Sequence, residues 1–331
     1  MMGVTLSLAR PMSVILEVEH VTTYRYAREV TFGTHRVAFH PRAAHDIRVL
    51  YADLTASPHC RQHWIHDVFS NSVAVVEPLV PADTLSFTAR FAIEHLGVKN
   101  QELPVDPSAE NYPFEYTYDD RLNLAGFLAL QYPDDAAAVR DWVAGFMPQR
   151  GTIHTRDVLS NINQFIRTDF TYATRDAMGT QSPAQTLALR SGTCRDFALL
   201  MMEAARGLGM AARFVSGYIY DPALDDESAD GQEVVGQGVQ SVDVGGGTLG
   251  SGATHAWLHV YLPGAGWVPF DPTNTLFGGT DLIRVAFTRT PEQAAPVSGG
   301  WTGAPGDYLG MEVSVNVRRR LPAIAGTPTL G

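Results

Sequence analysis

The stretch "SGTCRDFALLMMEAARGLGMAARFVSGY", residues 191–218, decides how this chain is interpreted. Beyond Cys194, apolar side chains recur at helical spacing, and Gly207 and Gly209 mark the end of the predicted helix. Ser191 or Thr193 can cap the beginning of that helix. A run typical of a β-strand follows. Cys194 is therefore expected in the first turn of a helix that leads into a strand.

The beginning of a helix gives a thiol an unusual environment. Unpaired backbone N–H groups and the helix dipole favour an anion there, so a thiol at Cys194 should lose its proton more readily than a free one. The resulting thiolate is a nucleophile, and the same N–H groups can hold the oxyanion of an acyl-transfer intermediate. The alternative is that Cys194 is a small core residue. This stretch alone leaves both interpretations open.

A second stretch, "THAWLHVYLPGAGWVPFDPTN" (residues 254–274), supplies the groups that a thiolate nucleophile needs. A nucleophile of this kind requires a base, and the base requires a group that orients it. His255 stands at the head of one predicted strand, and Asp271 stands at the end of the next. Strand alternation puts His259 on the same face as His255, but the sequence shows no partner for His259. The two histidines can therefore be compared, because only His255 is expected to have a carboxylate partner.

The geometry of this predicted hairpin tests whether the two groups can meet. A four-residue loop would place Asp271 on the side opposite His255. A three-residue loop, which pairs Leu262 with Gly266, would place both on one face as diagonal neighbours within reach of a hydrogen bond. A catalytic role therefore predicts a hairpin loop with an odd number of residues, or a bulge that changes which face Asp271 points to. An Asp271 carboxylate oxygen should then lie about 2.6–3.2 Å from one ring nitrogen of His255, with the other ring nitrogen facing Cys194.

Together, the two stretches resemble the bacterial transglutaminase-like superfamily, whose members share a papain-like Cys-His-Asp core. The Gly-x-Cys-x-Asp-Phe-Ala segment, the Ala-Arg-Phe-Val-Ser-Gly-Tyr strand, His-Ala-Trp and Trp-x-Pro-Phe-Asp-Pro-Thr occur in the family's order between about residues 150 and 275. The resemblance implies Cys194 as nucleophile, His255 as general base and then acid, and Asp271 as orienting group. Papain-type enzymes use a glutamine as oxyanion donor where this chain has Ala188, so no side-chain donor is assigned.

The remainder of the chain predicts a second unit. Short alternating segments broken by turn residues indicate antiparallel β structure, and "TTYRYAREVTFGTHRVAFHPR" and "HDVFSNSVAV" resemble the β domain that precedes these cores. The expected fold class is α+β. Its four expected parts are the N-terminal antiparallel β domain (14–100), a connecting helical segment (101–150), a transglutaminase-like core of helices packed on an antiparallel sheet (151–290), and a C-terminal strand with a flexible tail (291–331).

Two helix starts are predicted between these motifs. Thr155 can cap the helix that follows it, and Ser182 can cap a short helix whose first residue is Pro183. Residues 221–254 form a Gly-rich, acidic insertion without Lys or Arg directly before His255. It is either an inert linker or a segment that lies beside the site.

Charge and composition exclude several function classes. The net charge of -11 argues against nucleic acid and anionic membrane as partners, and no apolar run approaches the roughly 20 residues that span a bilayer. Two cysteines do not make a disulfide framework, so we expect free thiols in the cytoplasm. His59, Cys60, His63 and His66 have ligand-type side chains, but a three-residue offset on a strand separates the two later histidines. No metal ligand is therefore assigned.

The predicted function is cysteine-dependent acyl transfer through a thioester on Cys194, on a peptide or protein substrate with an amide carbonyl. The acyl group passes to water in a peptidase or amidase, or to an amine in a transamidating enzyme, and no cofactor is needed. The alternative is a non-catalytic papain-like binding or scaffold module. Substrate identity and oligomeric state are left open by the sequence.

Overall fold

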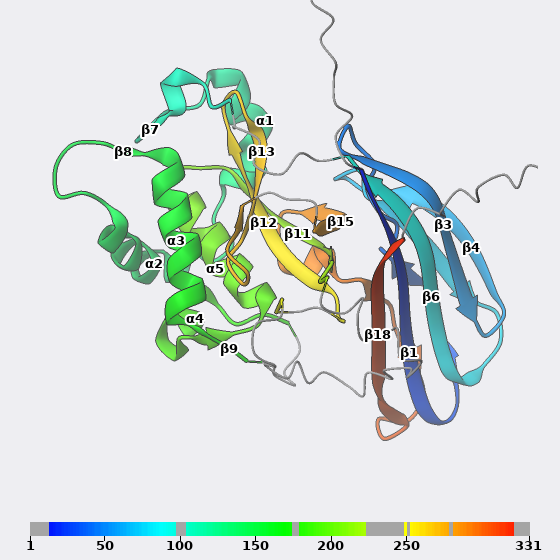
Figure 1. Ribbon diagram of the computed structural model, residues 1–331. Coiled ribbons are helices and arrows are strands. Elements are labelled where there is room, and N and C mark those ends of the chain that lie inside the picture. Colours follow the sequence, from blue (N-terminus) through cyan, green and yellow to red (C-terminus); the bar gives the residue numbers. More distant parts are fainter. Residues whose placement is uncertain are drawn as a thin grey trace, which may run out of the picture.

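The computed structural model describes residues 13–96, 104–173, 179–222, 248–249, 252–277 and 281–320. It is built from a β-sandwich and an α+β core that lie side by side, as the sequence predicts (Figure 1). Helices cover one side of the core sheet, and the sandwich lies on its other side (Figure 1). The predicted tail and most of the acidic insertion lie outside the described residues.

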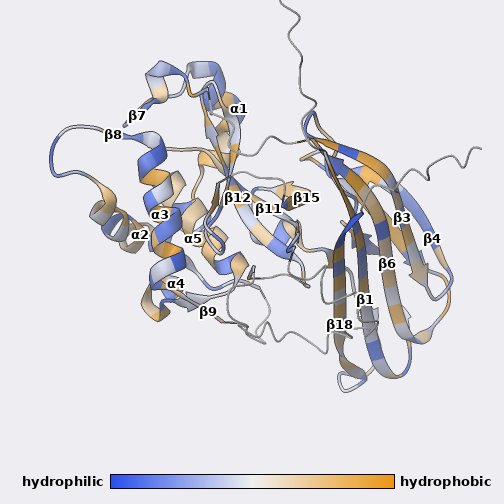
Figure 2. Cartoon of the chain, in the orientation of Figure 1, coloured by the Kyte–Doolittle hydropathy of each residue, from blue (hydrophilic) through white to orange (hydrophobic). Residues whose placement is uncertain are grey.

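Two antiparallel sheets form the sandwich. One sheet consists of β1 (Val14–Phe32), β3 (Ile47–Ser57), β6 (Ala82–His95), β17 (Trp301–Thr302) and β18 (Tyr308–Arg320). The other consists of β2 (His35–Val37), β4 (Cys60–His66), β5 (Ser72–Pro78) and β16 (Val297–Ser298). Apolar and polar residues alternate along the long strands, which places one set of side chains between the sheets and the other outside (Figure 2).

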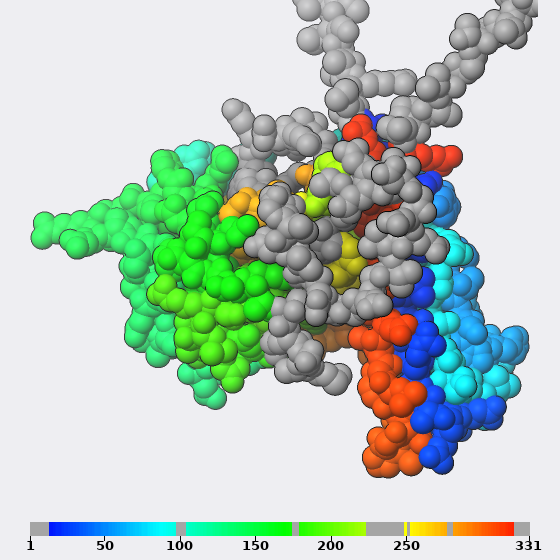
Figure 3. Space-filling model, turned by 60° about the horizontal axis from the view of Figure 1, so that its bottom comes forward, coloured from blue at the N-terminus to red at the C-terminus, as the bar shows by residue number. Residues whose placement is uncertain are grey.

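The C-terminal strand completes the sheet that the N-terminal strand begins. β18 pairs antiparallel with β1, with Val18 opposite Val317 and Ile15 opposite Arg320. Figure 3 shows the orange and red C-terminal segment against the dark blue of β1. The segment that the sequence predicts as a late strand therefore joins the N-terminal sandwich, so both ends of the chain hold this unit together.

The core contains a five-stranded antiparallel sheet in the order β14-β13-β12-β11-β15. Its strands are β11 (Ala212–Ile219), β12 (His255–Leu262), β13 (Gly266–Asp271), β14 (Leu276–Phe277) and β15 (Leu282–Thr288). The α-helices of the described residues are α1 (Tyr118–Leu128), α2 (Ala136–Val143), α3 (Thr155–Asp169), α4 (Pro183–Leu189) and α5 (Cys194–Gly207). Short two-residue strands complete it: β7 (Asn111–Tyr112), β8 (Ile153–His154), β9 (Thr171–Tyr172) and β10 (Ser191–Gly192).

One of the two predicted helix starts is confirmed and the other is wrong. Ser182 caps α4, because its side chain accepts from the N–H of Gln185 and the Gln185 side chain accepts from the N–H of Ser182. Thr155 does not cap α3, since it is already the first helical residue. Its fully buried hydroxyl donates to the carbonyl of Ala109 at 2.7 Å instead. A tertiary hydrogen bond has overridden the local preference.

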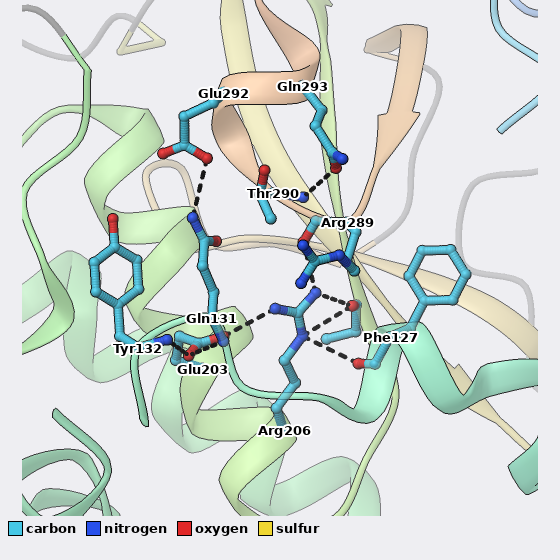
Figure 4. A network of polar contacts seen from close by, with 10 residues as sticks. Phe127, Gln131, Tyr132, Glu203, Arg206, Arg289, Thr290, Glu292 and Gln293 are labelled. Atoms are coloured by element: carbon cyan, nitrogen blue, oxygen red, sulfur yellow. Dashed lines mark hydrogen bonds and ion pairs between the residues drawn. The ribbon is translucent and has the colours of Figure 1, made fainter. Parts of the chain in front are cut away.

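Helix α5 is buried along almost its whole length between the core sheet and the other helices. Near its end, the buried ion pair of Glu203 and Arg206 forms a polar network (Figure 4). Glu203 accepts from the backbone N–H groups of Gln131 and Tyr132, each at 2.9 Å. Arg206 donates to the backbone carbonyls of three residues: Phe127, Ala212 and Arg289. With these partners satisfied, α5 is fixed to the segment after α1 and to the adjoining strands.

Sandwich and core share an apolar interface that includes Leu16 and Phe91 from one and Ile283 from the other. Polar groups are matched across it. The Asn71 amide donates to the carbonyl of Phe287 at 2.8 Å and accepts from its N–H at 2.9 Å, in the manner of a neighbouring strand. The Arg42 guanidinium stacks on the Phe287 ring at 4.6 Å. The sandwich therefore supports the edge strand β15 of the core sheet.

Candidate active site

Cys194 is the first residue of α5, and its side chain is buried. Of the two caps that the sequence allows, Thr193 is the one used. The N–H and the hydroxyl of Thr193 both donate to Asp196 Oδ2 at 2.8 Å, while its carbonyl accepts from the N–H of Phe197. The Cys194 N–H therefore has no acceptor within the helix.

Gly192 is required by the way the chain enters α5. A Cβ atom at this position would lie 2.9 Å from the Asp196 Cβ and 3.3 Å from the Phe197 ring, which is too close for a side chain. Asp196 is fully buried, and its Oδ1 accepts from the N–H of Gln181 at 2.7 Å. An acidic residue in the first turn is expected only to favour the helix dipole, but Asp196 also fixes two segments that precede Cys194, at Gln181 and at Thr193.

The hairpin β12–β13 has the three-residue loop that is needed to place His255 and Asp271 on one face. Leu262 pairs with Gly266, and the loop glycines Gly264 and Gly266 have positive φ angles of 82° and 72°. This register brings the Asp271 Oδ2 to 2.8 Å from the His255 Nε2, with both side chains fully buried. The predicted hydrogen bond between these two residues is present in the structure.

Asp271 is itself held by the residues that follow it. Its Oδ1 accepts from the N–H of Thr273 at 2.9 Å, and its Oδ2 accepts from the Asn274 side-chain amide at 3.0 Å. Burial would raise the pKa of Asp271, but the His255 charge and these hydrogen bonds outweigh it and lower the pKa. Sequence reasoning did not assign Asn274, although the Asp-x-x-Asn spacing is a pattern that closes a turn on a carboxylate.

The His255 ring is fixed on its other sides by packing. It stacks on Trp257 with 5.9 Å between ring centroids and an interplanar angle of 23°. Gly217 lies opposite His255 in the ladder of β11 and β12. A Cβ atom at Gly217 would lie 2.9 Å from the Trp257 ring and would collide with the carbonyl of Ile283. The Gly of the Val-Ser-Gly-Tyr segment is therefore needed to seat Trp257 under the imidazole.

The electrostatics favour a protonated imidazole at His255. Burial alone would lower its pKa, but the charge and hydrogen bond of Asp271, followed by the Cys194 thiol, raise the pKa to about 10. Nδ1 has no hydrogen-bond partner among the described residues, and the Cys194 thiol is close enough to the ring to raise its pKa. The three predicted residues are thus brought together, with one ring nitrogen on the carboxylate and the sulfur beside the ring.

Tyr172 is a further group at this site, and sequence reasoning missed it. Its ring contacts the Phe197 ring edge-on, with 6.4 Å between the ring centroids. The parallel pairing of β9 and β10 places Tyr172 opposite Gly192. Burial raises the pKa of the Tyr172 phenol, and Cys194 raises it further. The hydroxyl therefore keeps its proton at neutral pH.

Comparisons with known proteins agree with this arrangement. Residues 146–272 match the family model of the transglutaminase-like superfamily, and residues 16–94 match that of the bacterial transglutaminase-like N-terminal region. The chain carries a transglutaminase-like core. The range that matches the transglutaminase-like superfamily includes Cys194, His255, Asp271 and Tyr172.

Relatives of this chain include the uncharacterized protein Rv2569c of Mycobacterium tuberculosis, 27% identical over 307 residues, which are 88% of this chain and 90% of the relative. The uncharacterized protein ML0607 of Mycobacterium leprae is 31% identical over 124 residues, covering 38% of this chain and 37% of the relative. Among solved structures, "a Putative Cysteine Protease from Cytophaga hutchinsonii" aligns with a TM-score of 0.65 at 18% identity, over 94% of this chain and 92% of that one. This likeness shows the shared fold.

His259 differs from His255 although both lie on one face of β12. No carboxylate is among its described hydrogen-bond partners: Arg213 Nη2 lies 3.1 Å from Nδ1, and Trp257 Nε1 lies 3.3 Å from Nε2. Burial, together with the charges of Arg213 and Arg284, lowers the pKa of His259 well below its usual range. A neutral imidazole has one acceptor nitrogen, so only one of the two donors can be satisfied at a time.

The other candidate residues do not form a site within the described ranges. No group of three or more His, Cys, Asp or Glu side chains is arranged there to hold a metal ion. Both cysteines are free thiols. The Cys60 thiol donates to the carbonyl of Pro58 at 2.8 Å, and partial burial raises the pKa of Cys60. None of the helices that the structure describes is long and apolar enough to cross a membrane.

The described end of the acidic insertion lies against the site. Thr248 donates its N–H to the Asp221 carboxylate at 2.8 Å, which joins the two ends of the insertion. Asn274 accepts from the N–H of Leu249 at 2.9 Å and donates to its carbonyl at 3.1 Å. Because Asn274 also holds Asp271, the insertion is connected to the His255–Asp271 pair through one side chain. Residues 223–247 lie outside the described ranges.

Proposed function

We propose that this protein is a cysteine-dependent acyl-transfer enzyme that acts on the amide carbonyl of a peptide or protein. The observation that carries the proposal is the buried 2.8 Å hydrogen bond between His255 and Asp271, with the Cys194 thiol beside the same ring at a helix start. A carboxylate, an imidazole and a thiol in this order are the groups that nucleophilic acyl transfer requires.

In the proposed mechanism, His255 holds the proton of the Cys194 thiol, and the sulfur attacks the substrate carbonyl carbon. The carbonyl oxygen becomes an oxyanion, to which the Cys194 backbone N–H donates. The C–N bond then breaks as His255 passes its proton to the leaving amine, and a thioester remains on Cys194. Water or a second amine, deprotonated by His255, attacks the thioester and releases the acyl group and the thiol. Asp271 stabilises the imidazolium throughout.

Hydrolysis and transamidation differ only in the group that attacks the thioester. The Cytophaga hutchinsonii neighbour is named "a Putative Cysteine Protease", which supports a peptide substrate and water as the second nucleophile. The two free cysteines support a reducing compartment such as the cytoplasm. A binding or scaffold module would have no chemical need for all three groups.

Trapping of an acyl-enzyme tests the proposal without knowledge of the substrate. The protein is mixed with p-nitrophenyl acetate, quenched in acid and analysed by peptide mass spectrometry. We expect one acetyl group on Cys194 in the wild type and in Cys60→Ala, and none in Cys194→Ala. Chasing the acetyl-enzyme with water or glycine amide then measures the choice of acceptor. A wild-type protein that is never acetylated at Cys194 would favour the scaffold alternative.

A further inference from the structure

The Asn274 side chain joins two segments of the chain that flank the site. The N–H of Leu249 donates to Asn274 Oδ1 at 2.9 Å, and Asn274 Nδ2 donates to the carbonyl of Leu249 at 3.1 Å. Nδ2 carries a second hydrogen, which serves the contact with Asp271 Oδ2 at 3.0 Å. Both polar atoms of the amide therefore have partners, and these partners require one orientation of the side chain.

The orientation of this amide matters because its two ends have opposite character. An Asn274 side chain rotated by half a turn would place its oxygen against Asp271 Oδ2, so that two acceptors would face each other. Leu249 excludes that arrangement, since its N–H needs an acceptor and its carbonyl needs a donor. The backbone of Leu249 therefore determines that the NH2 group of Asn274, and not its oxygen, faces the carboxylate.

The carboxylate oxygen that this amide contacts is the one that His255 uses. Asp271 Oδ2 lies 2.8 Å from His255 Nε2. The other oxygen, Oδ1, accepts from the backbone N–H groups of Thr273 and Asn274 at 2.9 and 3.3 Å. Backbone groups thus hold one oxygen, and the Asn274 side chain holds the other against the imidazole. A catalytic hydrogen bond is productive only within a narrow range of positions, so this second contact bears on the reaction.

We propose that Asn274 is a positioning residue for the acyl-transfer reaction, which holds Asp271 on His255 and is itself oriented by Leu249. The proposal rests on the function proposed above. The contacts close a ring along the chain, because Leu249 lies six residues before His255 and Asn274 lies three residues after Asp271. The segment that leads into the base is thereby fixed to the segment that leaves the orienting group.

The residue before Leu249 is anchored to the core sheet. The N–H of Thr248 donates to the carboxylate of Asp221 at 2.8 Å, and Asp221 is a buried residue just beyond the end of β11. Contacts therefore lead from the end of β11, through Thr248 and Leu249, to the Asn274 amide. The described end of the acidic insertion is on this account a support for the catalytic pair and not an inert linker.

Two substitutions at Leu249 test this role without changing Asn274 or the reacting groups. Leu249→Pro removes the N–H that orients the amide, whereas Leu249→Ala keeps that N–H and is the matched control. We expect acetylation of Cys194 by p-nitrophenyl acetate to slow about 10-fold in Leu249→Pro and to stay close to the wild-type rate in Leu249→Ala. Asn274→Ala, which removes the amide itself, should slow acetylation at least as much as Leu249→Pro.

A spectroscopic readout separates positioning from a merely structural role. The proton between His255 Nε2 and Asp271 Oδ2 should give a strongly deshielded NMR signal, identified by isotope-labelled histidine and by its displacement in Asp271→Asn. In Asn274→Ala this proton should exchange with water faster than in the wild type, because Oδ2 is no longer held. Urea denaturation reports any loss of stability separately.

Each result has a defined meaning. A folded Asn274→Ala variant with unchanged acetylation and proton exchange would overturn the proposal, even if it were less stable. Equal effects of Leu249→Pro and Leu249→Ala would also overturn it. If Leu249→Pro fails to fold, Asn163→Ala replaces it as the comparison for Asn274→Ala, since Asn163 is another buried asparagine and should leave both readouts unchanged. Absence of acetylation in the wild type would instead defeat the acyl-transfer function, while the NMR signal would still report whether Asn274 holds Asp271.

Discussion

The hydrogen bonds on Asp271 decide which substitution can probe it. Replacement by Ala would leave the N–H of Thr273 and the amide of Asn274 without their buried acceptor, at a cost of about 1–3 kcal/mol for each unpaired group. Asp271→Asn keeps one oxygen and the shape of the side chain. It removes the negative charge that stabilises the imidazolium and turns one acceptor oxygen into an NH2 group, so urea denaturation of the variant separates an electrostatic loss of activity from a loss of stability.

Asp271→Asn should change the pH dependence of acetylation by p-nitrophenyl acetate. In the wild type, His255 has its pKa raised to about 10, so acetylation that needs the imidazolium should decline as the pH rises through about 10. Among the groups that raise this pKa against the effect of burial, the Asp271 charge contributes most, so its removal should lower the pKa and move the alkaline decline to lower pH. The maximal rate should also fall, by up to about 10⁴-fold. An alkaline decline at the same pH in both proteins would contradict this role of Asp271.

At the residue scale, the sequence predicted the groups that carry local patterns. Cys194 stands at a recognisable helix start. Asp271 ends a strand, and the length of the hairpin loop determines the face of the sheet to which it points. Tyr172 could not be found in this way. Its proximity to Cys194 depends on β9 pairing with β10 across an intervening helix, and no periodicity in its own segment reports that contact.

The decisive element is the hairpin β12–β13, because its register places the base and the orienting group on one face. Buried Val268 and Phe270 fix that register from the core side. The loop fixes it from the other side, since the N–H of Asp106 donates to the carbonyl of Pro263 at 2.8 Å. The two loop glycines share positive φ angles but have different surroundings, which makes them a matched pair.

Gly264→Ala should destabilise the protein more than Gly266→Ala. Both substitutions force a Cβ atom into the left-handed region, at about 1–2 kcal/mol. A Cβ on Gly266 meets nothing within 4 Å, whereas one on Gly264 would lie 2.6 Å from the N–H nitrogen of Asp106 and break the contact that anchors the loop. Urea denaturation of the two variants measures the difference in unfolding free energy. Equal losses would show that this anchor contributes nothing.

At the element scale, the helix and strands of the two quoted stretches agree with the sequence prediction. Strand β15 was not predicted, although "LIRVAFT" is rich in β-branched and aromatic residues. It pairs with β11, which lies more than sixty residues earlier, so its place at the sheet edge depends on a long-range contact. Thr155 failed as a predicted cap for the same reason, because a distant carbonyl competes for its hydroxyl.

The whole molecule depends on the contact between sandwich and core. Two motifs lie at this contact, and both belong to the N-terminal segments that resemble the family's β domain: Pro-Arg at the end of "TTYRYAREVTFGTHRVAFHPR" and Asp-x-x-x-Asn in "HDVFSNSVAV". Arg42 donates to Asn71 at 2.8 Å and stacks on Phe287, and Asn71 pairs with the Phe287 backbone. Phe287 belongs to β15, which pairs with β11, and β11 in turn pairs with the strand that begins at His255. The motifs that resemble a family feature in sequence are therefore interface residues that support the core sheet.

His20 makes this interface sensitive to acid. Its buried ring interacts with the Tyr218 hydroxyl at 2.8 Å and with the Thr22 hydroxyl at 2.9 Å, and burial lowers its pKa from 6.5 to about 3. The unfolded chain therefore binds a proton at His20 below about pH 6.5, but the folded protein does not until about pH 3. The stability present above pH 6.5 is lost progressively as the pH falls through this window, at up to about 1.4 kcal/mol per pH unit.

His20→Gln should reduce this acid sensitivity. The amide cannot take up a proton, so the unfolding free energy should fall less steeply between about pH 6 and 4 than in the wild type. Urea denaturation at several pH values measures the slope. His259 contributes to both proteins equally, and the exposed His59 gives a control substitution, His59→Gln. Parallel slopes in wild type and His20→Gln would contradict the assignment.

The central claim is that Cys194 is an activated nucleophile, and competitive alkylation of the two cysteines tests it most directly. Cys194 is 6% exposed, while Cys60 is more accessible, so accessibility alone would have iodoacetamide label Cys60 first. Activation by His255 predicts the reverse order near neutral pH, and the raised pKa of Cys60 slows its own reaction. Peptide mass spectrometry over a time course should show Cys194 modified while Cys60 remains free. Equal labelling, or labelling of Cys60 first, would contradict the account.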